Sequence, residues 1–206
     1  MSKRNIILGL GLILLCAWTF YSTRANKVPV PEYIVIEGGS GFEVREYGVY
    51  SIVETRVSAP YREALREGFE RLASYIEGNN STSEVISMTS PILIDREDAQ
   101  ERNILGDGEG LPETYRIAFI MPTEKTLDSL PEPNDIRLMK RIVPPHTVFV
   151  KNIRCMWGCL KESKQEKIIE KVADKGFAGD NVIYARYAFP WSIPFLVDNE
   201  LWLSVE

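Results

Sequence analysis

The sequence predicts an α+β domain of two ββαββ pseudo-repeats, which form a distorted eight-stranded, mostly antiparallel barrel or sheet with two helices. Two observations predict this class. Short stretches alternate apolar with polar residues, and two longer segments repeat apolar residues every three or four positions. The 206 residues are 45% hydrophobic and 26% charged, a composition typical of a globular chain. One large domain therefore accounts for most of the length.

The N-terminus is predicted to be an anchor that is separate from this domain. Residues 6–21 carry no charge, follow two basic residues and end with aromatic residues, as in a membrane-interface belt. We expect 6–21 to be a retained membrane anchor and the rest of 1–31 a linker, with a cleaved signal peptide as the alternative. The body, residues 32–206, would then lie outside the cytoplasm, in the periplasm if the organism is bacterial.

Alternation of apolar and polar residues predicts four strands in the first half of the domain. Two of them, over 42–47 and 49–57, flank a turn at Gly48. The other two follow a helix and cover Val85–Ile94 and Tyr115–Met121. This order gives the first ββαββ unit.

The helix of this half has recognisable ends and two distinct faces. Ser58 is its expected N-cap, Pro60 fits the first turn, and Gly78 marks the end. Its polar face carries two charge pairs at a spacing of four, Arg66/Glu70 and Glu67/Arg71. Its predicted apolar stripe has spacings of three and four: Tyr61, Leu65, Phe69, Leu72 and Ile76.

The second half repeats this order of elements with slight sequence identity to the first. Strands are predicted over Ile136–Ile142 and Thr147–Ile153. A helix then opens at Ser163–Glu166, which has the spacing of a capping box. The last two strands are Asn181–Tyr187 and Leu201–Val205.

The composition excludes several function classes. Four of the 24 basic residues lie before residue 32, which leaves 20 basic against 29 acidic residues in the body. Such a charge repels phosphate backbones, so we expect no nucleic-acid partner. The one histidine, His146, excludes zinc sites built from several imidazoles, and both serine and cysteine triads would require it. We therefore expect no enzyme. His146 is a weak axial-ligand candidate, and a surface or hydrogen-bonded histidine is the favoured interpretation.

Two segments near the C-terminus leave alternatives open. Cys155 and Cys159 would form a local disulfide in an oxidising compartment or stay as two unpaired thiols. Residues 189–196 are apolar, aromatic and interrupted by prolines, so they cannot form a regular central strand. They are predicted to form a rigid loop that either covers the core or lines an apolar cleft.

Six groups of motif residues follow one another in a fixed order along the body. They are Phe42–Tyr47; Glu63–Phe69 with Leu72, Tyr75–Ile76 and Gly78–Asn79; Met88–Pro91; Phe119–Pro122; Pro190, Trp191, Pro194 and Phe195; and Asn199–Trp202. In this ordered series the chain resembles the SOUL haem-binding protein family. The resemblance implies two ββαββ halves in a distorted barrel with two helices, which agrees with the pattern above.

The resemblance also implies a site and an activity. It implies non-covalent binding of haem or a related tetrapyrrole along the first helix and under the C-terminal proline loop, for transport, buffering or delivery. Arg66 would orient a propionate. The implied binding residues are Arg66, Phe69, Leu72, Ala73, Trp191, Ile193 and Phe195. At two other positions that are basic in the mammalian type of the family, this chain has Ser74 and Ile193. Glu46 stands where some members have a proposed axial histidine. A carboxylate is a poor ligand for haem iron.

Two other functions are compatible with the same residues. The duplicated ββαββ plan also resembles effector-binding domains of bacterial regulators, which would make this a module for another lipophilic small molecule. Alternatively, the apolar C-terminal loop would dock on a partner protein, as in a structural or assembly domain.

Overall fold

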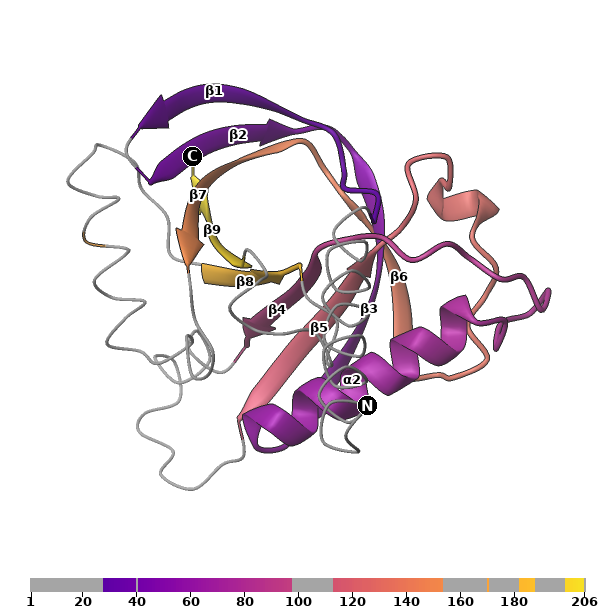
Figure 1. Cartoon of the computed structure of the whole chain (residues 1–206). Helices are drawn as coiled ribbons and strands as arrows, with labels where there is room; N and C mark the ends of the chain where they lie inside the picture. Colours follow the sequence, from indigo (N-terminus) through magenta and orange to yellow (C-terminus); the bar gives the residue numbers. More distant parts are fainter. Residues whose placement is uncertain are drawn as a thin grey trace, which may run out of the picture.

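The structure is a computed structural model that describes residues 28–39, 41–97, 113–153, 170, 182–187 and 199–205. These residues form nine strands in one antiparallel sheet, which curls into a half-barrel with one long described helix, α2, packed on it (Figure 1). The strands lie side by side in the order β1-β2-β7-β9-β8-β4-β5-β3-β6. Each pair of neighbours is antiparallel. The predicted α+β class is confirmed at this level.

The elements have the following bounds: β1 Tyr33–Gly39, β2 Phe42–Tyr47, β3 Tyr50–Ser58, α2 Tyr61–Ile76, β4 Ile92–Arg96, β5 Thr114–Ile120, a short 3₁₀ helix η2 Leu127–Ser129, β6 Leu138–Val143, β7 His146–Ile153, β8 Val182–Arg186 and β9 Asn199–Val205. Seven of the eight predicted strands lie within two residues of these bounds. The period of two in the sequence was therefore a sound guide to most of the sheet.

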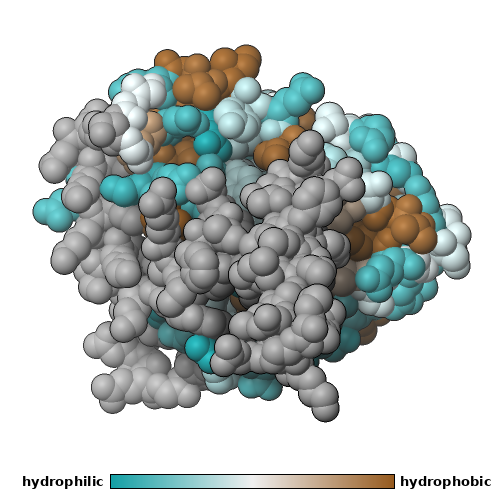
Figure 2. All heavy atoms as spheres, in the orientation of Figure 1, coloured by the Kyte–Doolittle hydropathy of each residue, from teal (hydrophilic) through white to brown (hydrophobic). Residues whose placement is uncertain are grey.

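The count of eight strands was wrong, because β1 was not predicted. Its sequence begins Tyr-Ile-Val-Ile, so apolar residues follow one another and the period-two signal is missing. Every residue of β1 is exposed, and the strand forms one edge of the sheet. The hydrophobic patch at the top of Figure 2 lies over β1. This strand depends on pairing with β2 rather than on a buried face.

The predicted strand over 85–94 was also wrong in its first part, since β4 begins only at Ile92. Pro91 has no N–H group to donate to a sheet ladder, so a strand cannot continue regularly through it. The chain before it is organised by buried Asn80 instead. The Asn80 amide donates to the carbonyl oxygens of Tyr75 and Glu84 at 2.9 and 2.7 Å.

The ends of α2 differ in part from the prediction. Pro60, not Ser58, is the N-cap residue. Ser58 is the last residue of β3, where it pairs with Thr114, and the two hydroxyl oxygens lie 2.9 Å apart. The C-terminal signal was right: Gly78 follows the helix with φ of +108°, a conformation that favours glycine.

The buried face of α2 is rotated relative to the predicted stripe. The residues that it buries are Ala64, Gly68, Leu72, Tyr75 and Ile76. Gly68 explains the rotation, because a Cβ there would lie only 2.8 Å from Cδ1 of Ile117 on β5. The helix backbone therefore approaches the sheet at a glycine, while Leu65 and Phe69 pack at the side of the contact.

The sheet has two buried faces, which carry two separate hydrophobic clusters. The outer face packs against α2 and includes Val53 and Phe119. The inner face of the half-barrel includes Ile52, Ala118 and Trp202. Side chains that alternate along β3 and β5 therefore serve two different environments.

Several predictions concern residues that the structure does not describe. The predicted second helix, except residue 170, and the loop over 189–196 lie outside the described residues, so the second ββαββ half stays a prediction. Cys155 and Cys159 lie outside them as well. No helix within the described ranges is long and apolar enough to cross a membrane, and residues 6–21 are not among them.

Replacing Gly68 by alanine tests the contact that seats α2. Overpacking a core costs about 1–3 kcal/mol, and about 1 kcal/mol is regained because alanine favours a helix more than glycine does. We expect Gly68→Ala to lower the free energy of unfolding, measured by denaturant titration, by up to about 2 kcal/mol. In an Ile117→Val background the loss should shrink, since the clashing Cδ1 is gone.

Gly48→Ala is the control for this substitution, because nothing lies within 4 Å of a Cβ placed there. It should leave the free energy of unfolding nearly unchanged. A Gly68→Ala variant that is equally stable or more stable in both backgrounds would show that the helix does not depend on this contact.

Candidate functional site

One side of α2 carries a half-buried apolar ridge. Leu65, Phe69 and Ala73 follow one another at a spacing of four, so they line up along the helix, and all three are partly buried. The Phe69 ring packs edge-on against Phe119 of β5, with ring centroids 5.5 Å apart. The ridge therefore offers apolar surface beside the helix while it remains anchored to the core.

The sequence-predicted residues on α2 have different environments. Phe69 and Ala73 belong to the ridge, whereas Leu72 is fully buried beneath the helix. Arg66 lies on the solvent side of the ridge, three positions before Phe69, with 61% of its side chain exposed. Leu72 therefore supports the ridge from below, and Arg66 borders it.

Arg66 already has a partner in the structure. Its Nη1 donates to both carboxylate oxygens of Glu70 at 2.9 and 2.8 Å. The hydrogen bond to Glu70 raises the pKa of Arg66, so the guanidinium is charged at any physiological pH. A ligand carboxylate that binds Arg66 has to share it with, or take it from, Glu70. The other predicted members of this site, Trp191, Ile193 and Phe195, lie outside the described residues.

His146, the weak axial-ligand candidate, lies on the opposite face of the sheet from α2. It begins β7, and its ring stacks on Tyr47 with centroids 5.7 Å apart. Its Nδ1 lies 2.9 Å from the carbonyl oxygen of Pro144, and its Nε2 lies 3.4 Å from the hydroxyl of Tyr50. Since a carbonyl can only accept, Nδ1 carries a proton, and in the neutral ring Nε2 accepts from Tyr50. Both ring nitrogens therefore have hydrogen-bond partners within the protein.

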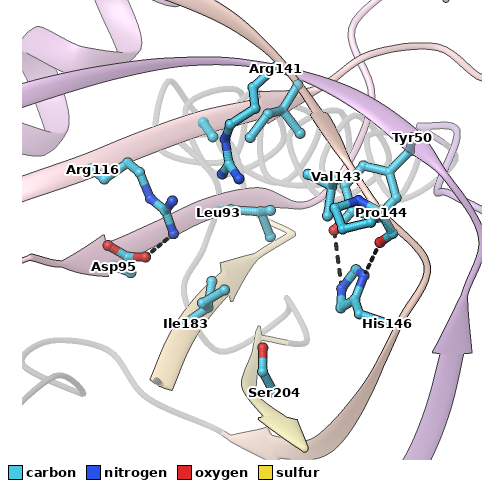
Figure 3. A pocket seen from close by; sticks show the side chains of 12 residues that line it. Tyr50, Leu93, Asp95, Arg116, Arg141, Val143, Pro144, His146, Ile183 and Ser204 are labelled. Carbon is cyan, nitrogen blue, oxygen red and sulfur yellow. Dashed lines mark hydrogen bonds and ion pairs between the residues drawn. The ribbon is translucent and has the colours of Figure 1, made fainter. Parts of the chain in front are cut away.

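A cavity of about 250 Å³ opens on the inner face of the half-barrel (Figure 3). Its walls come from strands β3 to β9 and from the turn between β6 and β7. The residues that line it are Tyr50, Ile52, Leu93, Asp95, Arg116, Ala118, Arg141, Val143, Pro144, His146, Ile183 and Ser204.

Tyr50 is one of the polar residues of this cavity. Burial raises the pKa of Tyr50 to about 12, against the opposing effect of the nearby arginines. Tyr50 is therefore a neutral donor at physiological pH.

Buried carboxylates hold the arginines of this cavity in place. Glu54, only 2% exposed, accepts from Nη2 of Arg141 at 3.1 Å and lies 3.8 Å from Nη1 of Arg116. Arg116 also pairs with Asp95. Figure 3 shows the Arg141 guanidinium pointing into the space between this pair and His146.

This cavity was not predicted, although the sequence contains a signal for it. Glu54 and Arg56 alternate with Val53, Thr55 and Val57 along β3, so charged residues occupy one face of a strand whose other face is largely apolar. Charges at such positions indicate a buried polar face. Within the described ranges, no group of three or more histidine, cysteine or acidic residues is arranged to hold a metal ion.

Comparison with known proteins identifies the family. The model for the SOUL heme-binding protein family matches residues 28–204. The chain belongs to the SOUL family. "Heme-binding protein 2" of Homo sapiens is 27% identical over 165 residues, which cover 79% of this chain and 77% of that protein. "Heme-binding protein 1" of Xenopus laevis is 33% identical over 93 residues, or 43% and 49% of the two chains.

The fold of this SOUL chain also occurs in solved structures of other proteins. The C-terminal domain of EcmrR aligns with a TM-score of 0.57 at 11% identity and covers 80% of this chain and 96% of that domain. A hydrolase from Listeria innocua aligns with a TM-score of 0.53 at 9% identity, over 83% and 94%. At such identities the likeness concerns the fold alone, and function has to be argued from sites.

One SOUL motif, Asn199–Trp202, has a clear structural role. Its Glu200 is buried and accepts from both terminal nitrogens of Arg45, at 3.0 and 2.8 Å. The same carboxylate accepts from the Tyr187 hydroxyl at 2.7 Å and from the Trp202 indole nitrogen at 2.8 Å. Burial, together with Glu200, raises the pKa of Tyr187, so its hydroxyl stays a donor. These bonds join β2, β9 and the residue that follows β8 inside the half-barrel.

Removing the charge of Glu200 should destabilise the protein strongly. Without Glu200, Arg45 keeps only the partly exposed Glu43 as a charged partner among the described residues, so we expect Glu200→Gln to lower the free energy of unfolding by about 3–5 kcal/mol. Glu43 contacts the same arginine but is 43% exposed, so Glu43→Gln is the matched control. That control should lose less than about 1 kcal/mol. Equal losses in denaturant titrations of the two variants would refute a special role for the buried carboxylate.

Proposed function

We propose that the SOUL domain, residues 32–206, binds haem or a related tetrapyrrole non-covalently and transports, buffers or delivers it without turnover. The observation that carries the proposal is the match of the family model over 28–204, together with relatives named heme-binding proteins. The geometry of α2 supports it, because an apolar ridge bordered by a cation suits a porphyrin plane with carboxylate side chains.

The ridge fits the two chemical parts of such a ligand. Phe69 and Ala73 would contact the apolar ring system, whose removal from water is the main source of affinity. Arg66 would bind a propionate, since the planar guanidinium group can donate two parallel hydrogen bonds to a carboxylate. Leu72, which is fully buried, would hold the helix under the ligand rather than contact it.

Iron coordination contributes little to this mode of binding. His146 lies on the other face of the sheet, so a porphyrin on α2 cannot reach it. Nor does the cavity beside His146 provide an alternative, because its volume of about 250 Å³ is below the range of pockets that enclose drug-sized ligands. We therefore infer that the ring and the propionates, not the iron, determine affinity.

A titration of the full-length chain with haemin, beside iron-free protoporphyrin IX, tests this proposal. Both ligands should saturate near one equivalent with similar affinities, followed by absorbance in the Soret region. His146→Ala should leave the haemin spectrum unchanged. If only haemin binds, or if its spectrum responds to His146→Ala, iron coordination matters and the ridge model fails. No saturation with either ligand would favour the module for another lipophilic molecule.

Arg66→Ala should weaken both porphyrins about tenfold, because a charge-assisted contact to a propionate is lost. Arg137→Ala is the control, since Arg137 is another exposed arginine paired with a carboxylate, that of Asp135, and is not on the ridge. It should leave affinity unchanged. An equal effect of both variants would mean that Arg66 acts only through the overall charge.

We also propose that residues 6–21 tether the domain to a membrane, with the body on the non-cytoplasmic side. The uncharged run and its aromatic end support this placement. After expression in a bacterium, the full-length chain should float with membranes in a density gradient, and protease added to spheroplasts should cut it. A chain that floats but is protected from the protease would have the opposite orientation, and one that stays with the soluble fraction would not be tethered.

A further inference from the structure

The inner cavity is left unexplained by a porphyrin on α2. It lies on the opposite face of the sheet, its volume is about 250 Å³, and two arginines line it. We propose that this cavity is a second ligand site, which takes a small aromatic carboxylate of one or two rings. The proposal does not rest on haem binding.

The walls of the cavity define the apolar part of the ligand. Five apolar side chains come from five different strands: Ile52, Leu93, Ala118, Val143 and Ile183. The rings of Tyr50 and His146 close one end, as seen in Figure 3, with centroids 5.6 Å apart. Aromatic rings pack well against such neighbours in offset or edge-on arrangements. The volume limits the ligand to about the size of a fused pair of rings.

Arg141 defines the charge of the ligand. Its Nε and Nη2 both donate to one oxygen of Glu54, at 3.3 and 3.1 Å, while Nη1 has no hydrogen-bond partner among the described residues. The side chain is 42% exposed and points into the cavity. Its donor is therefore available for a carboxylate, which a guanidinium binds better than it binds a neutral group.

The surrounding charges keep this donor fixed rather than create a broad positive field. Arg56, Arg116 and Arg141 are balanced by Glu54, Asp95 and Glu97. Arg116 and Arg141 line the cavity together with Asp95, which pairs with Arg116, whereas buried Glu54 holds both arginines from outside the lining. Little side-chain freedom is lost when a ligand binds to arginines that are already held, which favours affinity. An anion of defined shape, rather than any anion, is expected to bind.

Isothermal titration of the full-length chain with 2-naphthoate tests the site, with naphthalene-2-carboxamide as the neutral ligand of the same shape. The carboxylate should bind at one equivalent, at least about tenfold more tightly than the amide. Arg141→Gln should reduce its affinity about tenfold, to that of the amide. Arg137→Gln, an exposed arginine outside the cavity, should change nothing. Equal affinity for both ligands, or no response to Arg141→Gln, would overturn the proposal.

A second variant keeps the test decisive if Arg141→Gln unfolds because Glu54 loses a partner. Ile183→Phe would fill the cavity from β8 and should abolish naphthoate binding, with folding verified by thermal denaturation. The same variant should bind haemin normally, since Ile183 faces away from α2. Undiminished naphthoate binding by folded Ile183→Phe would exclude the cavity. Competition between naphthoate and haemin would show that there is one site, which contradicts a second one.

Discussion

The alternation of side chains along β3 and β5 is the constraint on which both proposed sites depend. Val53 and Phe119 face α2, whereas Ile52 and Ala118 face the inside of the half-barrel. A shift of one residue in pairing would exchange the two sets, so the register between these strands is fixed by burial on both faces. The contact between Gly68 and Ile117 then seats the helix on one face only. The ridge and the cavity are consequently on opposite sides of the same two strands.

The inner face differs from the outer one because it contains charges, and charges are buried only when partners compensate their loss of water. Glu200 meets this condition with four donated hydrogen bonds from three residues. Glu54 meets it by sharing three arginines, of which Arg141 extends toward open space. Arg116 and Arg141 line the cavity on this face, whereas α2 packs on β3 and β5 from the outer face.

Sequence patterns predicted strands reliably where a strand has one apolar face. They failed where the position of an element depends on strand pairing or on a close backbone contact instead. β2, β5 and β7 were predicted closely because their alternation is clear. β1 has no buried face, and so no alternation to detect. The buried face of α2 differs from the predicted apolar stripe, because the periodicity was read from large apolar residues. The helix backbone comes closest to the sheet at Gly68, which such a reading overlooks. The motif order identified the family, yet it could not reveal that Glu200 is a structural centre, because its donors Arg45 and Tyr187 are distant in the sequence.

The position of the one histidine bears on how a haem carrier of this kind would work. His146 has both ring nitrogens within hydrogen-bonding distance of Pro144 and Tyr50, and it faces the inner cavity rather than α2. A porphyrin on the ridge would then be held by apolar contact and by propionates, with Glu70 competing for Arg66. Affinity built in this way would depend weakly on the metal, and release would not require an iron–ligand bond to break. Reversibility of that kind suits delivery and buffering better than permanent retention of a prosthetic group.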